Sequence, residues 1–242
     1  MSGHSKWSTI KRKKEKTDAQ RAKIFTKIGR ELAVAVRDGG GPDPSVNSKL
    51  KDCIAKAKAN NVPNENIERI IKKAAGEGSE NNYENITYEG YGPNGVAVIV
   101  EALTDNRNRT AGNVRHYFDK YGGNLGTTGC VSFMFSPKGI ILIEKNELEE
   151  EKVMEDALDS GASDFSSDDE CFIVFTEKDS LNNVSDLLSG KGYKFVSSEI
   201  EMVPDSYINL DNEEAKNKMQ TLLDILDDDD DIQSVWHNCE DL

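Results

Sequence analysis

Apolar residues recur at helical spacing up to residue 76 and at alternating spacing soon after it, which excludes a fold made of one kind of element. In the first segment, one apolar stripe consists of Ile24, Ile28, Leu32, Ala35 and Val36. The motif "TDAQ" at 17–20 predicts the start of this helix, and Gly39 is expected to end it in a left-handed conformation. Similar stripes predict two further helices, which begin near Val46 and at Asn64. Short amphipathic helices hide their apolar faces only by packing together, so a three-helix bundle is expected.

Two strands are predicted within "ITYEGYGPNGVAVIVEAL", around Asn94-Gly95, a dipeptide favoured in tight hairpins. The same stretch contains "GYGPNG", which matches the G-x-G-x-x-G pattern of dinucleotide-binding loops. That function needs a helix directly after the glycines, and here the run "VAVIV" predicts a strand instead. A helix is expected near 110–121, and "VSFMF" at 131–135 is interpreted as a short strand.

The rest of the chain predicts a second α+β unit placed inside the first. Residues 138–204 show strand and helix patterns in the order βαββαβ, which is that of ferredoxin-like domains. After them come one helix, capped by "DNEE" at 211–214, and one strand, "IQSVWH". A lone helix and strand do not form a domain, so we expect them to complete the unit left unfinished near residue 137.

The expected fold class is therefore multidomain α+β. A basic arm and a three-helix bundle take residues 1–76, and the polar stretch "GEGSENN" links them to the first strand. A discontinuous, ferredoxin-like α+β domain is expected over 77–137 and 205–242. A second ferredoxin-like domain, 138–204, is expected as an insertion in it.

Charge is distributed unevenly along this chain of 242 residues, which has 30 Lys and Arg against 44 Asp and Glu and a net charge of −14. Residues 1–76 contain 18 basic and 8 acidic residues, a net of +10. The remaining 12 basic and 36 acidic residues give 77–242 a net of −24. Such asymmetry indicates a nucleic-acid-binding part joined to an acidic part that faces solvent or a partner.

The chain begins with a basic arm, which holds six basic residues and one acidic residue between positions 6 and 16. Cations neutralise phosphates and release counterions, and an aromatic ring can stack on an exposed base. The candidate nucleic-acid contacts in the arm are His4, Lys6, Trp7, Lys11, Arg12, Lys13 and Lys14. An ordinary solvated tail or a localisation signal would have a similar composition.

Basic side chains also lie opposite the apolar stripes of the predicted helices. The candidate contacts there are Lys23, Lys27, Arg30 and Arg37 on the first helix, and Arg69, Lys72 and Lys73 on the third. The second helix flanks its apolar side with Lys49, Lys51, Lys56 and Lys58. Solvated helix faces usually mix both signs of charge, and acids are few here. A bundle with a basic coat points to a phosphate backbone as its partner.

The stretch "TDNRNRT" at 104–110 adds Arg107 and Arg109 to the candidate nucleic-acid contacts. Two interpretations of these side chains stay open. In the first, Asp105 pairs with an Arg and Thr110 caps the following helix, so the residues are structural. In the second, the Arg guanidinium groups bind a phosphate or the carboxylate of a partner.

No pattern for catalysis or for a cofactor is found. There is no nucleophile with a base, no paired-carboxylate site and no phosphate loop at local spacing, so no catalytic residue and no enzymatic activity are predicted. The three His and four Cys show no ligand spacing, so no metal or other cofactor is expected. The acids of 149–169 and of "DDDDD" at 227–231 are interpreted as solvated faces that repel nucleic acid.

The same composition predicts where the protein works. No apolar run reaches the ~20 residues of a membrane helix. The four Cys are far apart in the sequence, which fits reduced thiols. A cytoplasmic protein without membrane contact is expected.

Several motifs occur in an order that resembles one known family. They are "GHSKWSTIKRKK", "FTKIGRELAVAVRDGG", "DPSVNSKLKDCIAKAKANNVPNENIERIIKKA", "YEGYGPNGVAVIVEALTDNRNRT" and "GGNLGTTGCVSFMF". Together they resemble the YebC/PmpR family, along essentially the whole chain and most densely over 3–136. The resemblance implies an N-terminal helical domain followed by two α+β domains, and it implies no catalytic residue. Cys130 stands where many relatives carry Ser.

The resemblance also implies a choice of functions, because members of the family are described both as DNA-binding transcriptional regulators and as ribosome-associated factors. Our first hypothesis is a monomeric, non-enzymatic translation factor that contacts ribosomal RNA and assists synthesis through difficult stretches such as consecutive prolines. The alternative is a transcriptional regulator that uses the same surface on DNA, although no helix carries Asn, Gln or Arg arrayed for base edges. A third hypothesis is a protein-interaction scaffold, in which the arm is incidental.

Overall fold

The computed structural model describes residues 18–76, 82–168 and 170–240, which form two compact units. One unit contains residues 18–132 and 210–237, and the other contains 133–209 and 238–240. Both units combine helices with an antiparallel sheet, so the predicted α+β class is confirmed. The basic arm, with its seven candidate residues, lies outside the described part of the chain.

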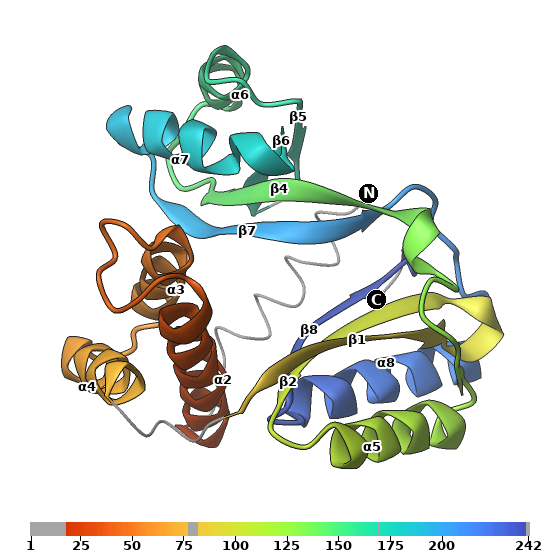
Figure 1. The fold of residues 1–242 in the computed structure, drawn as a ribbon. Helices are drawn as coiled ribbons and strands as arrows, with labels where there is room; N and C mark the ends of the chain where they lie inside the picture. Colours follow the sequence, from red (N-terminus) through yellow and green to blue (C-terminus); the bar gives the residue numbers. More distant parts are fainter. Residues whose placement is uncertain (1–17, 77–81, 169, 241–242) are drawn as a thin grey trace. The chain divides into compact units, whose positions relative to one another are not determined.

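Three helices form the bundle that begins the first unit (Figure 1). They are α2 (Asp18–Asp38), α3 (Ser48–Ala59) and α4 (Asn64–Ala75). The predicted apolar stripes meet in its core, where Leu32 and Leu50 are fully buried. Because the bundle buries one stripe from each helix, the basic side of α2 faces away from this core.

The loop after α2 differs from the expectation. The residues with left-handed backbone are Gly40 (φ 97°) and Gly41 (φ 114°), and Gly39 is not one of them. Gly39 is needed for another reason, since a Cβ there would collide with the side chain of Asn47. The buried Asn47 amide donates to the main-chain oxygens of Ala35 and Gly41, both at 2.8 Å, and its oxygen caps α3 by accepting from Leu50 N at 3.0 Å. One side chain therefore joins the end of α2 to the start of α3.

A hairpin forms the middle of the sheet in the first unit. Its strands are β1 (Glu84–Tyr91) and β2 (Ala97–Thr104), which pair antiparallel along their whole length. The turn places Asn94 (φ 55°) and Gly95 (φ 82°) in the left-handed region, as this dipeptide favours. The "GYGPNG" motif is thus a strand end and a 3-10 turn (Pro93–Gly95), and the strand β2, not an α-helix, follows its last glycine.

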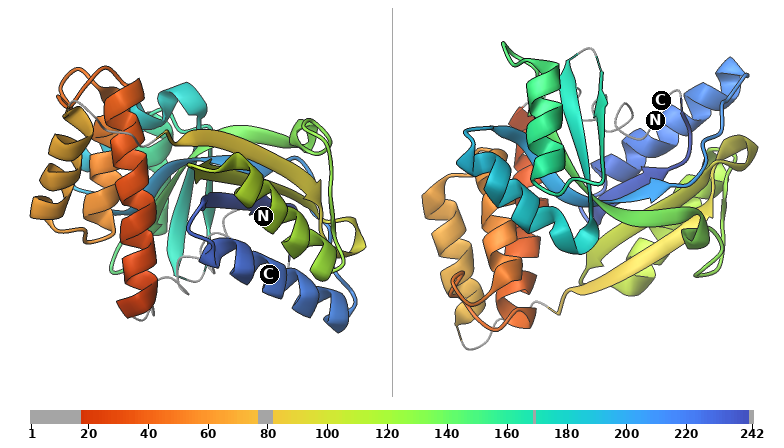
Figure 2. Two further views of the ribbon diagram at one scale, coloured as in Figure 1. Left: turned by 60° about the horizontal axis from the view of Figure 1, so that its bottom comes forward. Right: turned by 90° about the horizontal axis from the view of Figure 1, so that it is seen from above.

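Two short strands complete this sheet, and two helices pack on it. They are β3 (Asn124–Leu125), β8 (Ile232–His237), α5 (Arg107–Lys120) and α8 (Glu213–Asp228). The strand order is β3-β1-β2-β8, with β8 paired antiparallel to β2. Figures 1 and 2 show α5 and α8 side by side on one face of the sheet. This is a ferredoxin-like arrangement in which the end of the chain supplies α8 and β8, since a hairpin joins β1 directly to β2.

Two predicted elements are placed differently. Helix α5 begins at Arg107 because the Asn106 side chain caps it, accepting from Arg109 N at 3.1 Å, and Thr110 is buried within the helix. The predicted strand at 131–135 is wrong, since Ser132–Met134 is a 3-10 turn and the strand starts at Phe135. The physical reason is that the carboxylate of Glu89 accepts from the main-chain N–H groups of Val131 and Ser132, which removes them from any sheet.

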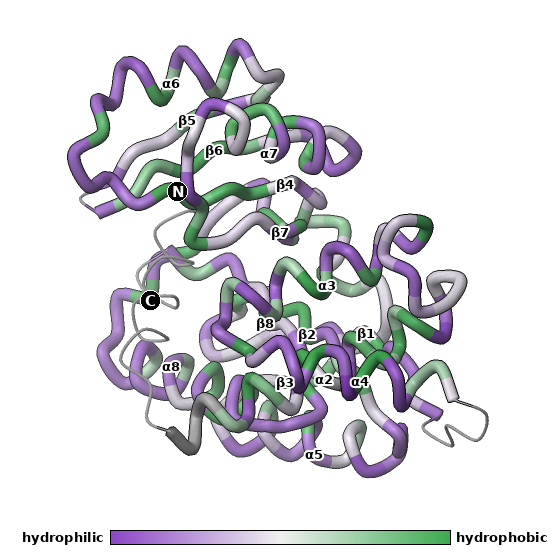
Figure 3. The backbone as a smooth tube through the Cα atoms, turned by 90° about the vertical axis from the view of Figure 1, so that its left-hand side faces the viewer, coloured by the Kyte–Doolittle hydropathy of each residue, from purple (hydrophilic) through white to green (hydrophobic). Residues whose placement is uncertain are grey.

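The second unit has the predicted βαββαβ order. Its elements are β4 (Phe135–Glu144), α6 (Glu150–Asp159), β5 (Asp164–Ser167), β6 (Cys171–Glu177), α7 (Leu181–Gly190) and β7 (Phe195–Pro204). The antiparallel order β5-β6-β4-β7 is that of a ferredoxin-like sheet. Ile141 and Phe172 from the strands pack with Val184 and Leu188 from α7. Figure 3 follows this division, with hydrophobic residues along β4 and β6 and many hydrophilic residues on α6.

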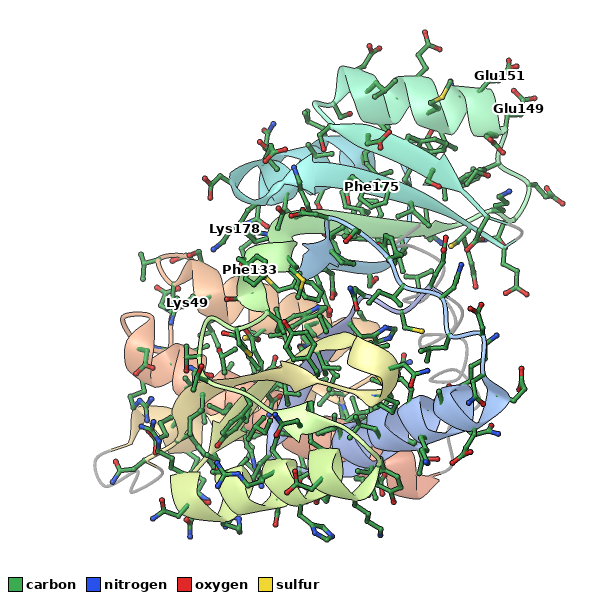
Figure 4. All side chains as sticks on the ribbon, turned by 90° about the vertical axis from the view of Figure 1, so that its right-hand side faces the viewer. Lys49, Phe133, Glu149, Glu151, Phe175 and Lys178 are labelled. Carbon is green, nitrogen blue, oxygen red and sulfur yellow. The ribbon has the colours of Figure 1, made fainter. Side chains whose placement is uncertain are left out.

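Acidic side chains coat the second unit, as predicted for 149–169. Glu149 and Glu151 project from the start of α6 (Figure 4) and are exposed. Asp168 is an exception, because it is 9% exposed and its Oδ1 accepts from the main-chain N–H groups of Glu170 and Cys171 at 2.8 and 2.7 Å. It closes the turn before β6, so it is structural.

We expect a pair of glycine substitutions to distinguish close packing from helix propensity. A Cβ at Gly90 in β1 would lie 2.6 Å from the main-chain oxygen of Asn124 and 2.9 Å from Phe118, whereas a Cβ at Gly112 in α5 meets nothing within 4 Å. Gly90→Ala should therefore lower the free energy of unfolding by about 1–3 kcal/mol. Gly112→Ala should raise it by about 0.5–1 kcal/mol. Guanidinium denaturation followed by circular dichroism measures both, and equal changes would contradict the packing of β1 against β3 and α5.

Candidate nucleic-acid interface

The basic face of α2 contacts the acidic segment, by which we mean residues 227–231. Lys23 Nζ lies 2.7 Å from Asp228 Oδ1 and donates to the Asp228 main-chain oxygen at 3.1 Å. Lys27 Nζ donates to the main-chain oxygen of Asp227 at 2.7 Å. These carbonyls end α8, where helical N–H donors are missing and the helix dipole is negative. The two lysines predicted to bind nucleic acid thus cap α8 in this structure.

Arg30 continues this contact at the buried end of the segment. Its NH1 donates to the main-chain oxygen of Asp230 at 2.8 Å and to Asp231 Oδ1 at 2.7 Å. The guanidinium also lies over the Tyr83 ring, 5.4 Å from its centroid. The Asp231 side chain is only 5% exposed and that of Arg30 only 19%, so this ion pair is largely shielded from salt.

Asp231 is the point where three elements meet. Besides Arg30 from α2, its carboxylate accepts from Arg109 NH2 and Thr110 Oγ1 of α5, both at 2.7 Å. Its main-chain oxygen accepts from Leu103 N of β2 at 2.7 Å. The interpretation of 227–231 as a wholly solvated face is therefore wrong for Asp231, because a buried carboxylate needs these donors to offset lost hydration.

These donors also set the acidity of Asp231. Burial raises the pKa of a carboxyl group, but hydrogen bonds from Arg109, Thr110 and Arg30 outweigh burial here and lower the pKa of Asp231 to about 2. The carboxylate therefore stays charged at any pH near neutrality.

The other aspartates of the segment divide into an inner and an outer set. Asp229 belongs to the inner set, since its Oδ2 accepts from Tyr117 OH at 3.0 Å and its Oδ1 from Asp231 N at 2.9 Å. Burial and this bond raise the pKa of Tyr117 to about 12. Asp227, Asp228 and Asp230 form the outer set, whose carboxylates lie toward solvent. Only the outer set matches the predicted solvated face.

Arg37 and Arg109 also have partners inside the first unit. Arg37 Nε lies 2.6 Å from Asp38 Oδ1, and Arg37 NH2 donates to the Tyr83 main-chain oxygen at 2.9 Å. Arg109 NH2 lies 2.9 Å from Asp105 Oδ1 in addition to its bond to Asp231. The structural interpretation of Arg109 is supported by both bonds, although its proposed cap, Thr110, is instead a donor to Asp231.

The exposed cations of the bundle lie on α3 and α4. Six of them make no ion pair with any residue that the structure describes: Lys49, Lys51, Lys58, Arg69, Lys72 and Lys73. Lys56 differs, because its Nζ lies 2.9 Å from Glu31 Oε1 of α2. Figure 4 marks Lys49 near the start of α3. The sequence predicts Arg69, Lys72 and Lys73 as contacts, whereas it places the lysines of α3 only beside the apolar side of that helix.

On α5, Arg107 is exposed and makes no ion pair within the described ranges, and the same holds for Arg115. The structure thus separates the two arginines of "TDNRNRT". Arg109 holds Asp105 and Asp231, and Arg107 leaves its charge available at the first turn of the helix.

Glu89 is a structural residue that the sequence did not reveal. It is 4% exposed, and its carboxylate accepts from the N–H groups of Gly129, Val131 and Ser132 at 2.8, 3.0 and 2.8 Å. Burial alone would raise the pKa of Glu89, and these three bonds outweigh it and lower the pKa. The donors lie 40 to 43 residues away in the sequence, so no local sequence pattern indicates these hydrogen bonds.

Within 18–76, 82–168 and 170–240, no group of three or more His, Cys, Asp and Glu is arranged to hold a metal ion. Among the helices that the structure describes, none has the length and apolar character needed to cross a membrane.

Two family models match this chain. The TACO1/YebC protein N-terminal domain matches residues 5–77, and the TACO1/YebC second and third domain matches residues 83–239. The chain belongs to the TACO1/YebC family. The family resemblance expected from the motifs is confirmed.

Similar proteins in the family carry regulatory names. A relative from Acetivibrio thermocellus, named probable transcriptional regulatory protein, is 61% identical over 239 residues, which is 98% of each chain. Another, from Hathewaya histolytica and named probable transcriptional regulatory protein ORF2U, is 58% identical over 241 residues, covering 99% of this chain and 97% of its own. A crystal structure of a conserved hypothetical protein from Aquifex aeolicus is 45% identical and superposes with a TM-score of 0.86, covering 93% of this chain and 92% of that one.

The lowered pKa of Asp231 predicts a specific loss of stability in acid. The unfolded carboxyl titrates at its ordinary value near 3.8 and the folded one at about 2. The contribution is thus present above pH ~4 and is lost as pH falls from ~4 to ~2, by roughly 2 kcal/mol. Asp231→Asn should remove this part of the pH dependence of the free energy of unfolding. Denaturant titrations between pH ~5 and ~2 measure it.

A control variant makes this measurement decisive. Asp119→Asn removes an exposed carboxylate from α5, so it should keep the acid dependence of the wild type. If both variants lose stability in parallel with the wild type, Asp231 does not hold the network described above.

Proposed function

We propose that this protein is a non-enzymatic, ribosome-associated translation factor that binds RNA through its basic N-terminal part. The observation that carries the proposal is the set of six exposed cations on α3 and α4 that make no ion pair with the described residues. They belong to residues 1–76, which have a net charge of +10 in a protein of net charge −14. Internal pairing removes Lys23, Lys27 and Arg30 from this surface and leaves α3 and α4 as the basic face.

The kind of cation favours contact with a phosphate backbone over reading of bases. Five of the six exposed cations are lysines, whose flexible stems carry compact charges. Arg, Asn and Gln read base edges through pairs of hydrogen bonds in a fixed geometry, whereas a lysine ammonium acts mainly as a point charge, and the cations of α3 are all lysines. Backbone binding that needs no defined sequence suits ribosomal RNA, where position on the ribosome supplies the specificity.

The proposal extends to the rest of the protein. The acidic second unit, with exposed Glu149 and Glu151, is expected to face solvent or basic ribosomal proteins, since it would be repelled by RNA. Assistance to synthesis through difficult stretches, such as consecutive prolines, would come from positioning RNA or tRNA, with no covalent step. We further propose that the protein acts as a cytoplasmic monomer.

A DNA-binding transcriptional regulator is the alternative, and the regulatory names of the relatives favour it. It would use the same cations on α3 and α4. A large preference for a promoter fragment over random DNA at physiological salt would support it, because sequence selectivity needs base contacts. Equal affinity for the two DNA fragments would count against it.

The proposal predicts which cations the ribosome needs. Lys51→Glu, Lys58→Glu, Lys72→Glu and Lys73→Glu together should weaken co-sedimentation with purified ribosomes. The slope of log affinity against log salt should flatten by ~0.7 for each phosphate that the variant no longer neutralises. Deleting residues 1–16 should also weaken binding, since the arm carries candidate RNA-binding side chains.

The matched control reverses exposed lysines of the second unit. Lys152→Glu and Lys178→Glu (Figure 4 marks Lys178) change charge in the same way on side chains that make no ion pair in the described structure. They should leave co-sedimentation almost unchanged. If control and bundle variants weaken binding equally, net charge and not the α3–α4 face governs it.

A further inference from the structure

The contact between α2 and the acidic segment has two parts that differ in exposure. At the inner part, Arg30 meets Asp231, whose side chain is 5% exposed. At the outer part, the side chains of Lys23 and Asp228 are 39% and 62% exposed. Exposed ion pairs contribute little to stability and are screened by salt, whereas buried ones persist. The outer part is therefore the one that another anion can exchange.

The outer part also carries more negative charge than the fold uses. Asp229 and Asp231 hold α5 and α2 through hydrogen bonds. Within the described residues, neither the carboxylate of Asp227 nor that of Asp230 takes part in an ion pair. Closing the turn between α8 and β8 needs only the inner pair. Of the outer set, the Asp228 carboxylate contacts Lys23, and the exposed Asp227 and Asp230 add negative charge to the same segment, whose Asp227 main-chain oxygen accepts from Lys27.

We propose that the Lys23 and Lys27 end of α2 is a second, shielded binding surface for an RNA phosphate backbone, and that Asp227, Asp228 and Asp230 occupy it in the free protein. This inference rests on the proposed RNA binding and adds a surface on α2 to the one on α3 and α4. The acidic segment presents the anionic Asp228 Oδ1 to Lys23 and main-chain oxygens to both lysines, where a nucleotide strand would present phosphate oxygens. RNA that reaches this end of α2 displaces the outer carboxylates while Arg30 and Asp231 keep the bundle attached.

The shield has a consequence for specificity. A short or weakly bound strand meets the exposed α3–α4 cations but is repelled by the outer carboxylates near α2. A strand held firmly on a large particle stays close long enough to replace them. The outer set thus lowers binding to stray RNA more than binding to the intended target.

The test compares affinity for a single-stranded oligouridylate of about 20 nucleotides, measured by fluorescence anisotropy across a salt series. The variant Asp227→Asn, Asp228→Asn and Asp230→Asn should bind more tightly than wild type. Its slope of log affinity against log salt should steepen by ~1.4, which corresponds to two additional phosphates at ~0.7 each. Glu149→Gln, Glu151→Gln and Glu155→Gln remove the same charge from α6 and its N-terminal cap, and they should leave the slope unchanged.

A second pair of variants identifies the surface. Lys23→Ala and Lys27→Ala should abolish the increase in affinity in the neutralised background and should have little effect on their own, because the wild-type lysines are occupied. If the increase survives without the lysines, the aspartates act only by long-range repulsion and the inference is overturned. Every variant keeps Asp229 and Asp231, so each is expected to fold. Circular dichroism and thermal melting check that it does.

The outcomes also separate this inference from the proposed function. If wild type binds the RNA through α3 and α4 but neutralisation changes nothing, the inference alone fails. If wild type does not bind and the neutralised protein binds through Lys23 and Lys27, the α3–α4 surface fails and the inference holds. Absence of binding by every variant, even at low salt, would overturn both.

Discussion

The fold of the first unit depends on one buried carboxylate, that of Asp231. It lies where the end of β2, the start of α5 and the middle of α2 come together, and it accepts a hydrogen bond from Arg109, Thr110 and Arg30. Removing one member of such a network leaves buried charges unpaired, which is costlier than never having had them. Because two of its donors are guanidinium groups, the bundle and the sheet are joined by electrostatics as well as by packing.

This use of charge changes where the positive charge of the bundle is exposed. Lys23, Lys27 and Arg30 direct their charge to α8 and the acidic segment, so the unpaired cations of the described bundle lie mainly on α3 and α4. The acidic remainder therefore pairs with part of this positive charge. Because it neutralises one side of α2, the exposed positive charge of the bundle lies on one side, whereas a uniformly basic bundle would expose it on all sides.

Local periodicity predicted most elements because each of them buries a stripe within its own segment. The apolar stripe of α2, the apolar run of β2 and the Asn94-Gly95 turn are properties of neighbouring residues. The polar network was not predictable in this way, because Arg109 and Asp231 are 122 residues apart. The same limit explains the error at 131–135, where an apolar alternation looks like a strand until Glu89, 42 residues before Val131, takes its N–H group. Hydrogen bonds between residues that are far apart in the sequence produce no periodic pattern from which they could be predicted.

Glu89 and Asp231 share a physical logic that bears on the site. Each is a carboxylate buried inside an acidic part of the chain, each accepts several hydrogen bonds, and each has its pKa lowered despite burial. A carboxylate in such a place fixes segments that are distant in the sequence, in addition to the apolar cores, which suits a chain that is 31% charged. Within the run of five aspartates, the same residue type therefore has two different roles. Asp231, buried and saturated with donors, builds the fold, whereas we propose that the exposed aspartates beside Lys23 limit which anions reach α2.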